Sequence, residues 1–315
     1  MAVTYSVVIP VYGNEGSILA LIDRVAELQD GLGSPVEAVF VVDGSPDQSY
    51  ELLRRHLPTA PFPSRLTLLS RNFGAFAAIR VGLGQASGSV IATMSADLQE
   101  PLDLIHRFLV ELTGGDTDIV IGVRTGREDS LRARIGARVF WGLYRRLVMP
   151  EIPTGGVDVF GCTAEIRDQL LRLTETRSSL VAQLFWIGFR RMEVPYQRQP
   201  RHSGKSAWNL GKKLRYLSDS VFAFTDLPIR LLTISGLAGL VVSVALGSLV
   251  LIGRILSWFT APGYTVTVEL ILLFGSLNLL GLGLVGSYAW RSYENTKSRP
   301  EAIPMVSESF GERSM

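Results

Sequence analysis

Two long apolar runs near the end of the chain restrict its architecture more than any other feature. Neither residues 231–253 nor residues 270–290 include a charged side chain. Each run is long enough to cross a hydrocarbon layer of about 30 Å. Two buried helices of a soluble core would both have to lack a polar face, which is unusual. The runs therefore predict a transmembrane hairpin at residues 230–293, in agreement with a hydrophobic share of 47%.

The charges beside these runs predict the orientation of the hairpin. The loop between the runs carries only Arg254 and Glu269, whereas basic residues gather on both outer sides. Those basic residues are Lys212, Lys213, Arg215, Arg230, Arg291, Lys297 and Arg299. Because basic flanks stay in the cytoplasm, we expect a multi-pass protein of the inner or plasma membrane whose main domain and both termini are cytoplasmic.

The beginning of the chain and its cysteine content agree with that compartment. The first residues, "MAVTYSVVIPVYG", lack the basic and apolar regions of a secretory signal. The single cysteine, Cys162, excludes an internal disulfide and suits a reducing compartment.

Short apolar runs alternate with amphipathic stretches over the first half of the chain, which predicts βαβ units and a largely parallel sheet. The expected strands are residues 5–12, 36–44, 65–72, 89–97 and 118–124. The expected helices are residues 16–28, 48–56, 75–85 and 102–112, each with apolar residues at three-to-four spacing.

Three further segments are expected outside this α/β region. Residues 208–224 have one apolar face and lie directly before the first apolar run, which predicts a helix in the membrane interface. Residues 131–150 form a basic amphipathic stretch that fits anionic head groups, and equally a solvated helix face. The polar, proline-marked segment after Arg299 is expected to be disordered.

Polar side chains follow three of the expected strands. Asp43, Asp97 and Arg124 stand at strand ends, and the carboxyl ends of parallel strands share one edge of the sheet, where ligands collect. The stretch "MSADLQEP" adds Gln99, two residues after Asp97. In a strand-like segment both side chains would point to one side. Their oxygens suit Mg²⁺ shared with a phosphorylated substrate.

Several other chemistries find no support in the sequence. The chain has no "GxxxxGK[ST]" and no "GxGxxG" that opens a helix, so a Walker-type kinase and a Rossmann dehydrogenase are not indicated. The histidines, His56, His106 and His202, do not form a metal-spaced pair. We expect no nucleic-acid partner.

From Tyr5 to about Tyr293, the chain resembles the polyprenyl-phosphate branch of the family 2 glycosyltransferases, the group that includes dolichol-phosphate mannose synthase and bacterial relatives with two carboxy-terminal transmembrane helices. The matching pieces, in order, are "SVVIPVYGNEGSI", "VVDGSPDQS", "SRNFGAFAAIRVGL", "SADLQEP", "GVR", "IPTGGVDVFGCTAEI" and "RHSGKSAWNLGKKLRYLSDSVFAFTDLPIRLL". Each piece is weakly specific alone, and their shared order is what makes the resemblance strong.

The resemblance implies an α/β fold of the GT-A type at residues 1–200, a juxtamembrane amphipathic region at 201–229, the hairpin at 230–293 and a flexible cytoplasmic tail at 294–315. It implies a membrane-bound, inverting enzyme. Such an enzyme moves a sugar from a UDP- or GDP-sugar to a polyprenyl phosphate, such as undecaprenyl phosphate, at the cytoplasmic face. A homo-oligomer is also expected.

The resemblance also implies roles for particular residues. Asp97 and Gln99 would hold Mg²⁺ or Mn²⁺, and Asp158 would be a catalytic base or a positioning group near the acceptor. The residues that would line the nucleotide-sugar pocket are Pro10, Tyr12, Glu15, Asp43 and Arg71. The residues that would grip phosphates of the acceptor are Arg124, Arg201 and Lys205, since basic side chains pair with phosphate oxygens.

Three positions depart from the family pattern. Ser95 and Val42 stand where relatives usually have an aspartate, and Phe160 stands where many have an arginine. The loss of a carboxylate at Ser95 weakens the expected metal site. These departures keep open a degenerate relative that acts as a nucleotide-sugar or lipid-phosphate binding subunit. A processive polysaccharide synthase is less favoured, because the chain has no "QxxRW" stretch.

Overall fold

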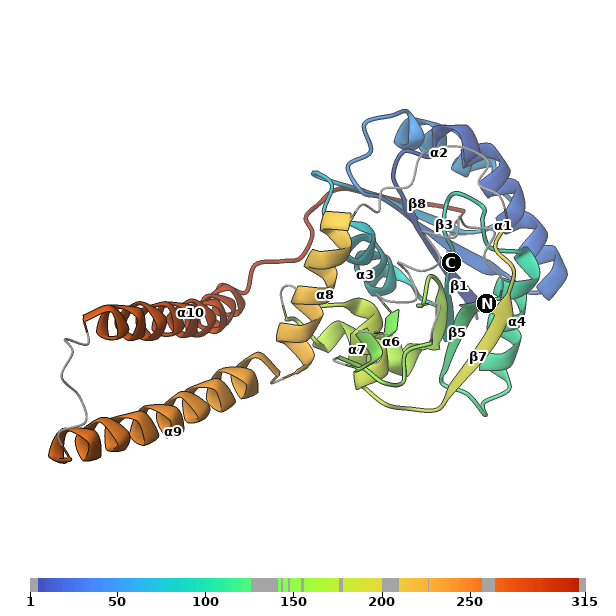
Figure 1. Ribbon diagram of the computed structural model, residues 1–315. Helices are drawn as coiled ribbons and strands as arrows, with labels where there is room; N and C mark the ends of the chain where they lie inside the picture. Colours follow the sequence, from blue (N-terminus) through green and yellow to red (C-terminus); the bar gives the residue numbers. More distant parts are fainter. Residues whose placement is uncertain are drawn as a thin grey trace.

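The computed structural model shows one α/β domain from which two long helices project (Figure 1). It describes residues 5–125, 141–142, 144–146, 148–153, 156–175, 178–199, 210–225, 227–256 and 264–311. The strands are β1 Tyr5–Val11, β2 Val36–Val42, β3 Ser64–Leu69, β4 Val90–Thr93, β5 Ile119–Arg124, β6 Phe160–Thr163, β7 Arg191–Tyr196 and β8 Pro304–Phe310. The helices are α1 Ile18–Leu32, α2 Ser49–His56, α3 Ala75–Gln85, α4 Leu102–Thr113, α6 Ala164–Arg172, α7 Leu180–Trp186, α8 Leu210–Phe224, α9 Leu227–Ile255 and α10 Tyr264–Thr296.

The strands form one mixed, mostly parallel sheet in the order β7-β5-β6-β4-β1-β2-β3-β8. β1, β2, β3 and β4 run parallel, and β5 runs parallel to β7. β6 is antiparallel to both β4 and β5, so those two strands point the same way. The predicted α/β fold with a largely parallel sheet is confirmed.

Helices cover both faces of the sheet, because alternate residues of each strand point to opposite sides. In β1, Val7 and Ile9 pack under α1, α2 and α4, whereas Val8 packs under α3 and its neighbours. Helices α6, α7 and α8 complete this second layer (Figure 1). All seven residues of β2 are buried, as expected for a strand between two helical layers.

The last strand contradicts the prediction of a flexible tail at residues 294–315. Residues 304–310 form β8, which pairs antiparallel with β3 and becomes an edge of the sheet. The side chain of Glu308 pairs with Arg54, and the hydroxyls of Thr67 and Ser307 lie 3.2 Å apart. The segment was predicted to be disordered because it is polar, but an edge strand needs few buried side chains when a neighbour supplies the hydrogen bonds.

Helices α8, α9 and α10 form the projecting arm and its base. Leu217, Val221 and Phe224 of α8 pack on the domain, and Arg291 of α10 donates to Asp219 of α8 over 2.8 Å. α9 contacts α10, and the two helices point away from the sheet together (Figure 1).

Within the described residues, one helical stretch, Leu273–Thr296, is long and apolar enough to cross a membrane. A second candidate passes only as a bent pair, Leu217–Phe224 with Leu227–Gly239, whose halves meet at 76°. The predicted first run at 231–253 lies within α9 and the second at 270–290 within α10.

Candidate functional site at the carboxyl edge of the sheet

The predicted polar residues do gather along one edge of the sheet. Asp43 follows β2, Asp97 follows β4, and Arg124 ends β5; these strands all point the same way. Asp158 precedes β6, which runs in the opposite direction, so its beginning lies at the same edge. Arg201 and Lys205 lie outside the described residues.

The loops after β1 and β2 are tied to each other where the nucleotide pocket was predicted. The backbone N–H of Gly13 donates to Ser45 Oγ over 2.8 Å. Glu15 donates through its backbone to Asp47, and its own carboxylate accepts from the backbone of Gln48. The bonds hold the segment that carries Glu15 and the exposed Tyr12. Pro10 lies one residue before the end of β1.

Asp43 is buried and serves as a structural anchor in this structure. Its two carboxylate oxygens accept from the backbone N–H groups of Phe73 and Gly74, over 2.7 and 2.8 Å. The next residue, Gly44, has a φ of 57°, and a Cβ there would overlap the backbone of Arg71. Arg71 in turn stacks its guanidinium 4.0 Å from the ring centroid of Phe73. Asp43 therefore fixes the loop that presents Arg71.

Replacing Asp43 with alanine leaves two backbone N–H groups without their acceptor. We expect the Asp43→Ala chain to lose about 3 kcal/mol of unfolding free energy, because each buried donor without a partner costs about 1–3 kcal/mol. Urea unfolding followed by tryptophan fluorescence measures the loss. The matched control is Asp23→Ala on the exposed side of α1, and equal effects of the two changes would contradict the anchoring role.

Asp97 lies in a turn rather than in a strand, which corrects the predicted strand at 89–97. β4 ends at Thr93, and Leu98 has a φ of 59°, in the left-handed region. This bend places the side chain of Leu98 in the core and lets the backbone of Gln99 approach Oδ1 of Asp97, at 3.4 Å. Asp97 and Gln99 are thus neighbours because of a turn, and the prediction that a strand pleat aligns their side chains was wrong.

The same turn contains a buried acid, Glu100, for which no role was predicted. Glu100 is 2% exposed and accepts from both the backbone N–H and the hydroxyl of Ser95. Burial raises its pKa, while the hydrogen bond from Ser95 lowers it. Ser95, where relatives usually carry an aspartate, is therefore paired with a carboxylate five residues later.

The segment after β7 joins this turn. The backbone N–H of Gln199 donates to the carbonyl of Gln99 over 2.8 Å, and the Gln99 amide donates to the carbonyl of Gln199 over 3.2 Å. A guanidinium nitrogen of Arg198 lies 4.0 Å from Oδ2 of Asp97. These contacts bring Arg198 to the predicted diphosphate site. No role was predicted for this cation from the sequence.

Asp158 lies in an ionic cluster beside the Asp97 turn, since β6 pairs with both β4 and β5. Nε of Arg124 forms an ion pair with Oδ2 of Asp158, and the hydroxyl of Tyr196 donates to the same oxygen over 3.1 Å. Burial lowers the pKa of Arg124, but Asp158 raises it and the net shift is upward, so the guanidinium stays charged. Arg124 and Asp158, predicted separately, thus form one unit.

Tyr196, Arg198 and Gln199 were missed because no strand was predicted for "RMEVPY". The signal was present: buried Val194 and Tyr196 alternate with exposed Glu193 and Pro195, which is the period of a half-buried strand. Pro195 suits this strand because β7 is an edge of the sheet.

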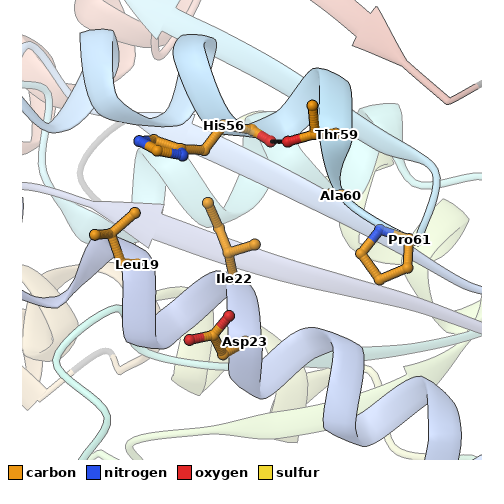
Figure 2. Close-up of a pocket in the computed structure, with 7 residues that line it drawn as sticks. All are labelled: Leu19, Ile22, Asp23, His56, Thr59, Ala60 and Pro61. Carbon is orange, nitrogen blue, oxygen red and sulfur yellow. Dashed lines mark hydrogen bonds between the residues drawn. The ribbon is translucent and has the colours of Figure 1, made fainter.

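Two surface hollows lie apart from this cluster. One, of about 380 Å³, lies between α1 and the end of α2; Figure 2 shows its lining, with Asp23 and His56 as the ionisable side chains. The other, of about 450 Å³, lies between α8 and α10 beside the Arg291–Asp219 pair. Neither hollow includes a predicted site residue.

Comparison with known proteins identifies the class. The model of the family "Glycosyl transferase family 2" matches residues 6–173. A glycosyltransferase of Synechocystis sp. is 30% identical over 99% of this chain and 97% of its own. The chain therefore belongs to glycosyltransferase family 2, and its fold is GT-A-like.

Two relatives have more specific names. The undecaprenyl-phosphate 4-deoxy-4-formamido-L-arabinose transferase of Edwardsiella ictaluri is 30% identical over 94% of this chain and 91% of its own. The bactoprenol glucosyl transferase of Shigella phage SfX is 29% identical over 95% of this chain and 97% of its own. Both similarities extend through the carboxy-terminal helices as well as the α/β domain.

Proposed function

We propose that this protein transfers a sugar from a nucleotide-sugar donor to a polyprenyl phosphate at the membrane surface, with inversion at the anomeric carbon. The observation that carries the proposal is the shared edge of the sheet, where Asp97 and Gln99 follow β4 and the Arg124–Asp158 pair lies on the neighbouring strands β5 and β6. This edge belongs to a domain whose helical arm is apolar, and two relatives similar over nearly the whole chain are named for undecaprenyl phosphate and for bactoprenol.

The two parts of the edge suit the two substrates. Arg71 and Tyr12, on loops fixed by Asp43 and Ser45, are exposed beside the predicted nucleotide pocket. Arg124 can neutralise the acceptor phosphate and orient it, since a guanidinium pairs with two phosphate oxygens at once. A lipid phosphate is already an anion at neutral pH. The site therefore mainly has to align the reactants and balance charge.

A divalent cation fits the donor end as a partner shared with the substrate. Among the described residues no group of three His, Cys, Asp or Glu side chains could hold a metal ion alone. Asp97 and Gln99 nevertheless offer a carboxylate and an amide oxygen, and Mg²⁺ usually takes one or two carboxylates with phosphate oxygens and water. Bound there, Mg²⁺ or Mn²⁺ would stabilise the charge that the leaving nucleoside diphosphate gains.

The path of the chain supports a hairpin in the membrane. α8 packs on the catalytic domain before the arm, and β8 pairs with β3 after it, so the chain leaves and returns on one side. If the chain crosses a membrane between α8 and β8, it must therefore cross back before β8. Leu237 of α9 and Leu279 of α10 are among many apolar side chains that are over half exposed and suit contact with lipid. We infer that α9 and α10 both span, with the domain and both termini in the cytoplasm.

The decisive experiment is sugar transfer in detergent. Purified protein is mixed with undecaprenyl phosphate and a panel of radiolabelled UDP- and GDP-sugars, with Mg²⁺, Mn²⁺ or chelator. We expect lipid-linked radioactivity from one donor and at least tenfold less with chelator, because the diphosphate then lacks its counter-ion. Binding of a donor without release of nucleoside diphosphate would instead favour a binding subunit.

A further inference from the structure

Tyr196 is a buried residue that the mechanism above does not use. It ends β7, opposite Arg124 in the β5–β7 register, and is 5% exposed. Its hydroxyl donates to Oδ2 of Asp158 over 3.1 Å, the oxygen that also pairs with Arg124. A phenol donor and a guanidinium from neighbouring strands therefore meet on one carboxylate oxygen.

The packing around Tyr196 fixes the position of its ring. A Cβ on Gly122 of β5 would lie 3.2 Å from Cε1 of Tyr196, so the ring rests directly against that glycine. The carbonyl of Tyr196 also accepts from the backbone and the hydroxyl of Thr125, over 2.8 and 3.0 Å. The hydroxyl is thus held in place by the sheet, which is how a rigid support for a functional group is built.

The surroundings also keep Tyr196 protonated. Burial raises its pKa, and the charges of Asp158 and Glu100 raise it further, against the opposite effect of Arg124. At neutral pH the phenol is therefore a hydrogen-bond donor to Asp158.

We propose that Tyr196 is a positioning residue which, with Arg124, fixes Asp158 as a stationary anion and so aims the Arg124 guanidinium at the acceptor phosphate. The inference rests on the proposed function, because it assigns the lipid phosphate to this end of the site. It also favours the positioning role of the two left open for Asp158. The Oδ2 atom that already accepts from a phenol and pairs with a guanidinium anchors these groups and is a poor acceptor for a further proton.

The test begins with Tyr196→Phe, which keeps the ring and removes only the donor. We expect the KM for undecaprenyl phosphate to rise roughly tenfold, the effect of a lost hydrogen bond to a charged group. The KM for the nucleotide sugar should stay unchanged, and the thermal unfolding midpoint should fall by only a few degrees, because one buried hydrogen bond is lost. The matched control is Tyr5→Phe, whose hydroxyl accepts from Thr113 at the opposite edge of the sheet. Equal rises in both KM values would overturn the positioning role.

The second step repeats the change in an Asp158→Ala background. If Tyr196 acts through Asp158, removing its hydroxyl there has no further effect, whereas effects that multiply would overturn the inference. Equilibrium binding of undecaprenyl phosphate, which needs no turnover, is measured alongside transfer. A wild-type protein that neither binds nor glycosylates this lipid overturns the proposed function and the inference with it. If the wild-type protein transfers sugar and Tyr196→Phe leaves the KM for undecaprenyl phosphate unchanged, the inference alone is overturned.

Discussion

Replacing Asp97 with asparagine is expected to lower sugar transfer about 100- to 1000-fold, the range for removal of one group that stabilises developing charge. The carboxylate is held in its turn by the backbone of Gln99, and asparagine keeps the shape of the side chain but removes its charge. The diphosphate would then have to leave without its counter-ion in place. Initial rates at saturating Mg²⁺, with the nucleotide sugar that the donor panel selects, measure the loss.

A control and a binding measurement make the Asp97 result specific. Asp116→Asn removes an exposed charge in the loop before β5, at the opposite edge of the sheet, and should leave the rate unchanged. Mn²⁺ affinity in the presence of nucleoside diphosphate, followed by electron paramagnetic resonance, should weaken only for Asp97→Asn. Unchanged turnover in Asp97→Asn would remove Asp97 from the proposed site.

Truncation after Arg299 is expected to have the largest effect on stability. The shortened chain loses the pairing of β8 with β3, the Glu308–Arg54 pair and the buried side chain of Ala302. The lost hydrogen bonds are worth about 1 kcal/mol each, so we expect a loss of about 3–6 kcal/mol. The exposed edge of β3 should also promote aggregation. Thermal unfolding and light scattering in detergent measure both effects.

Two further variants, one truncated and one with two introduced cysteines, test the position of β8. Truncation after Gly311 keeps the strand and should unfold like the full chain. Thr67→Cys combined with Ser307→Cys should form a disulfide on mild oxidation, because the two hydroxyls lie 3.2 Å apart and the native Cys162 is buried. The product should migrate as a single chain on a non-reducing gel. A cross-linked dimer, or no cross-link at all, would contradict pairing of β8 with β3 of the same chain.

The sequence predicted the central sheet well and its edges poorly. Central strands such as β2 are continuous apolar runs between turn residues, and burial on both faces leaves that pattern visible. No residue of β8 is fully buried, and the strand mixes Met, Val and Phe with Ser and Glu, so its pairing with β3 was not evident from its composition. The projecting helices were predictable because length and the absence of charge are sufficient signals.

The sequence predicted where along the chain the candidate site residues lie, but not the backbone bends and contacts that bring them together. Strand ends led to Asp97 and Arg124, but the bend at Leu98 could not be foreseen, because φ values in the left-handed region are rare for leucine. The convergence of Tyr196 and Arg124 on Asp158 depends on the β5–β7 pairing, which is distant in sequence and has no local signal.

The closing of the sheet by β8 has a consequence for how the protein is made. A ribosome releases residues 5–199 first, yet the hydrogen-bonding edge of β3 stays open until residues 304–310 emerge. Between these moments α9 and α10 are synthesised, and the proposed hairpin would enter the bilayer before the last strand is available to pair. A polypeptide stalled within α10 would leave the edge of β3 unpaired, and unpaired strand edges promote aggregation with other chains. Completion of the sheet thus requires that translation has passed through both helices of the arm.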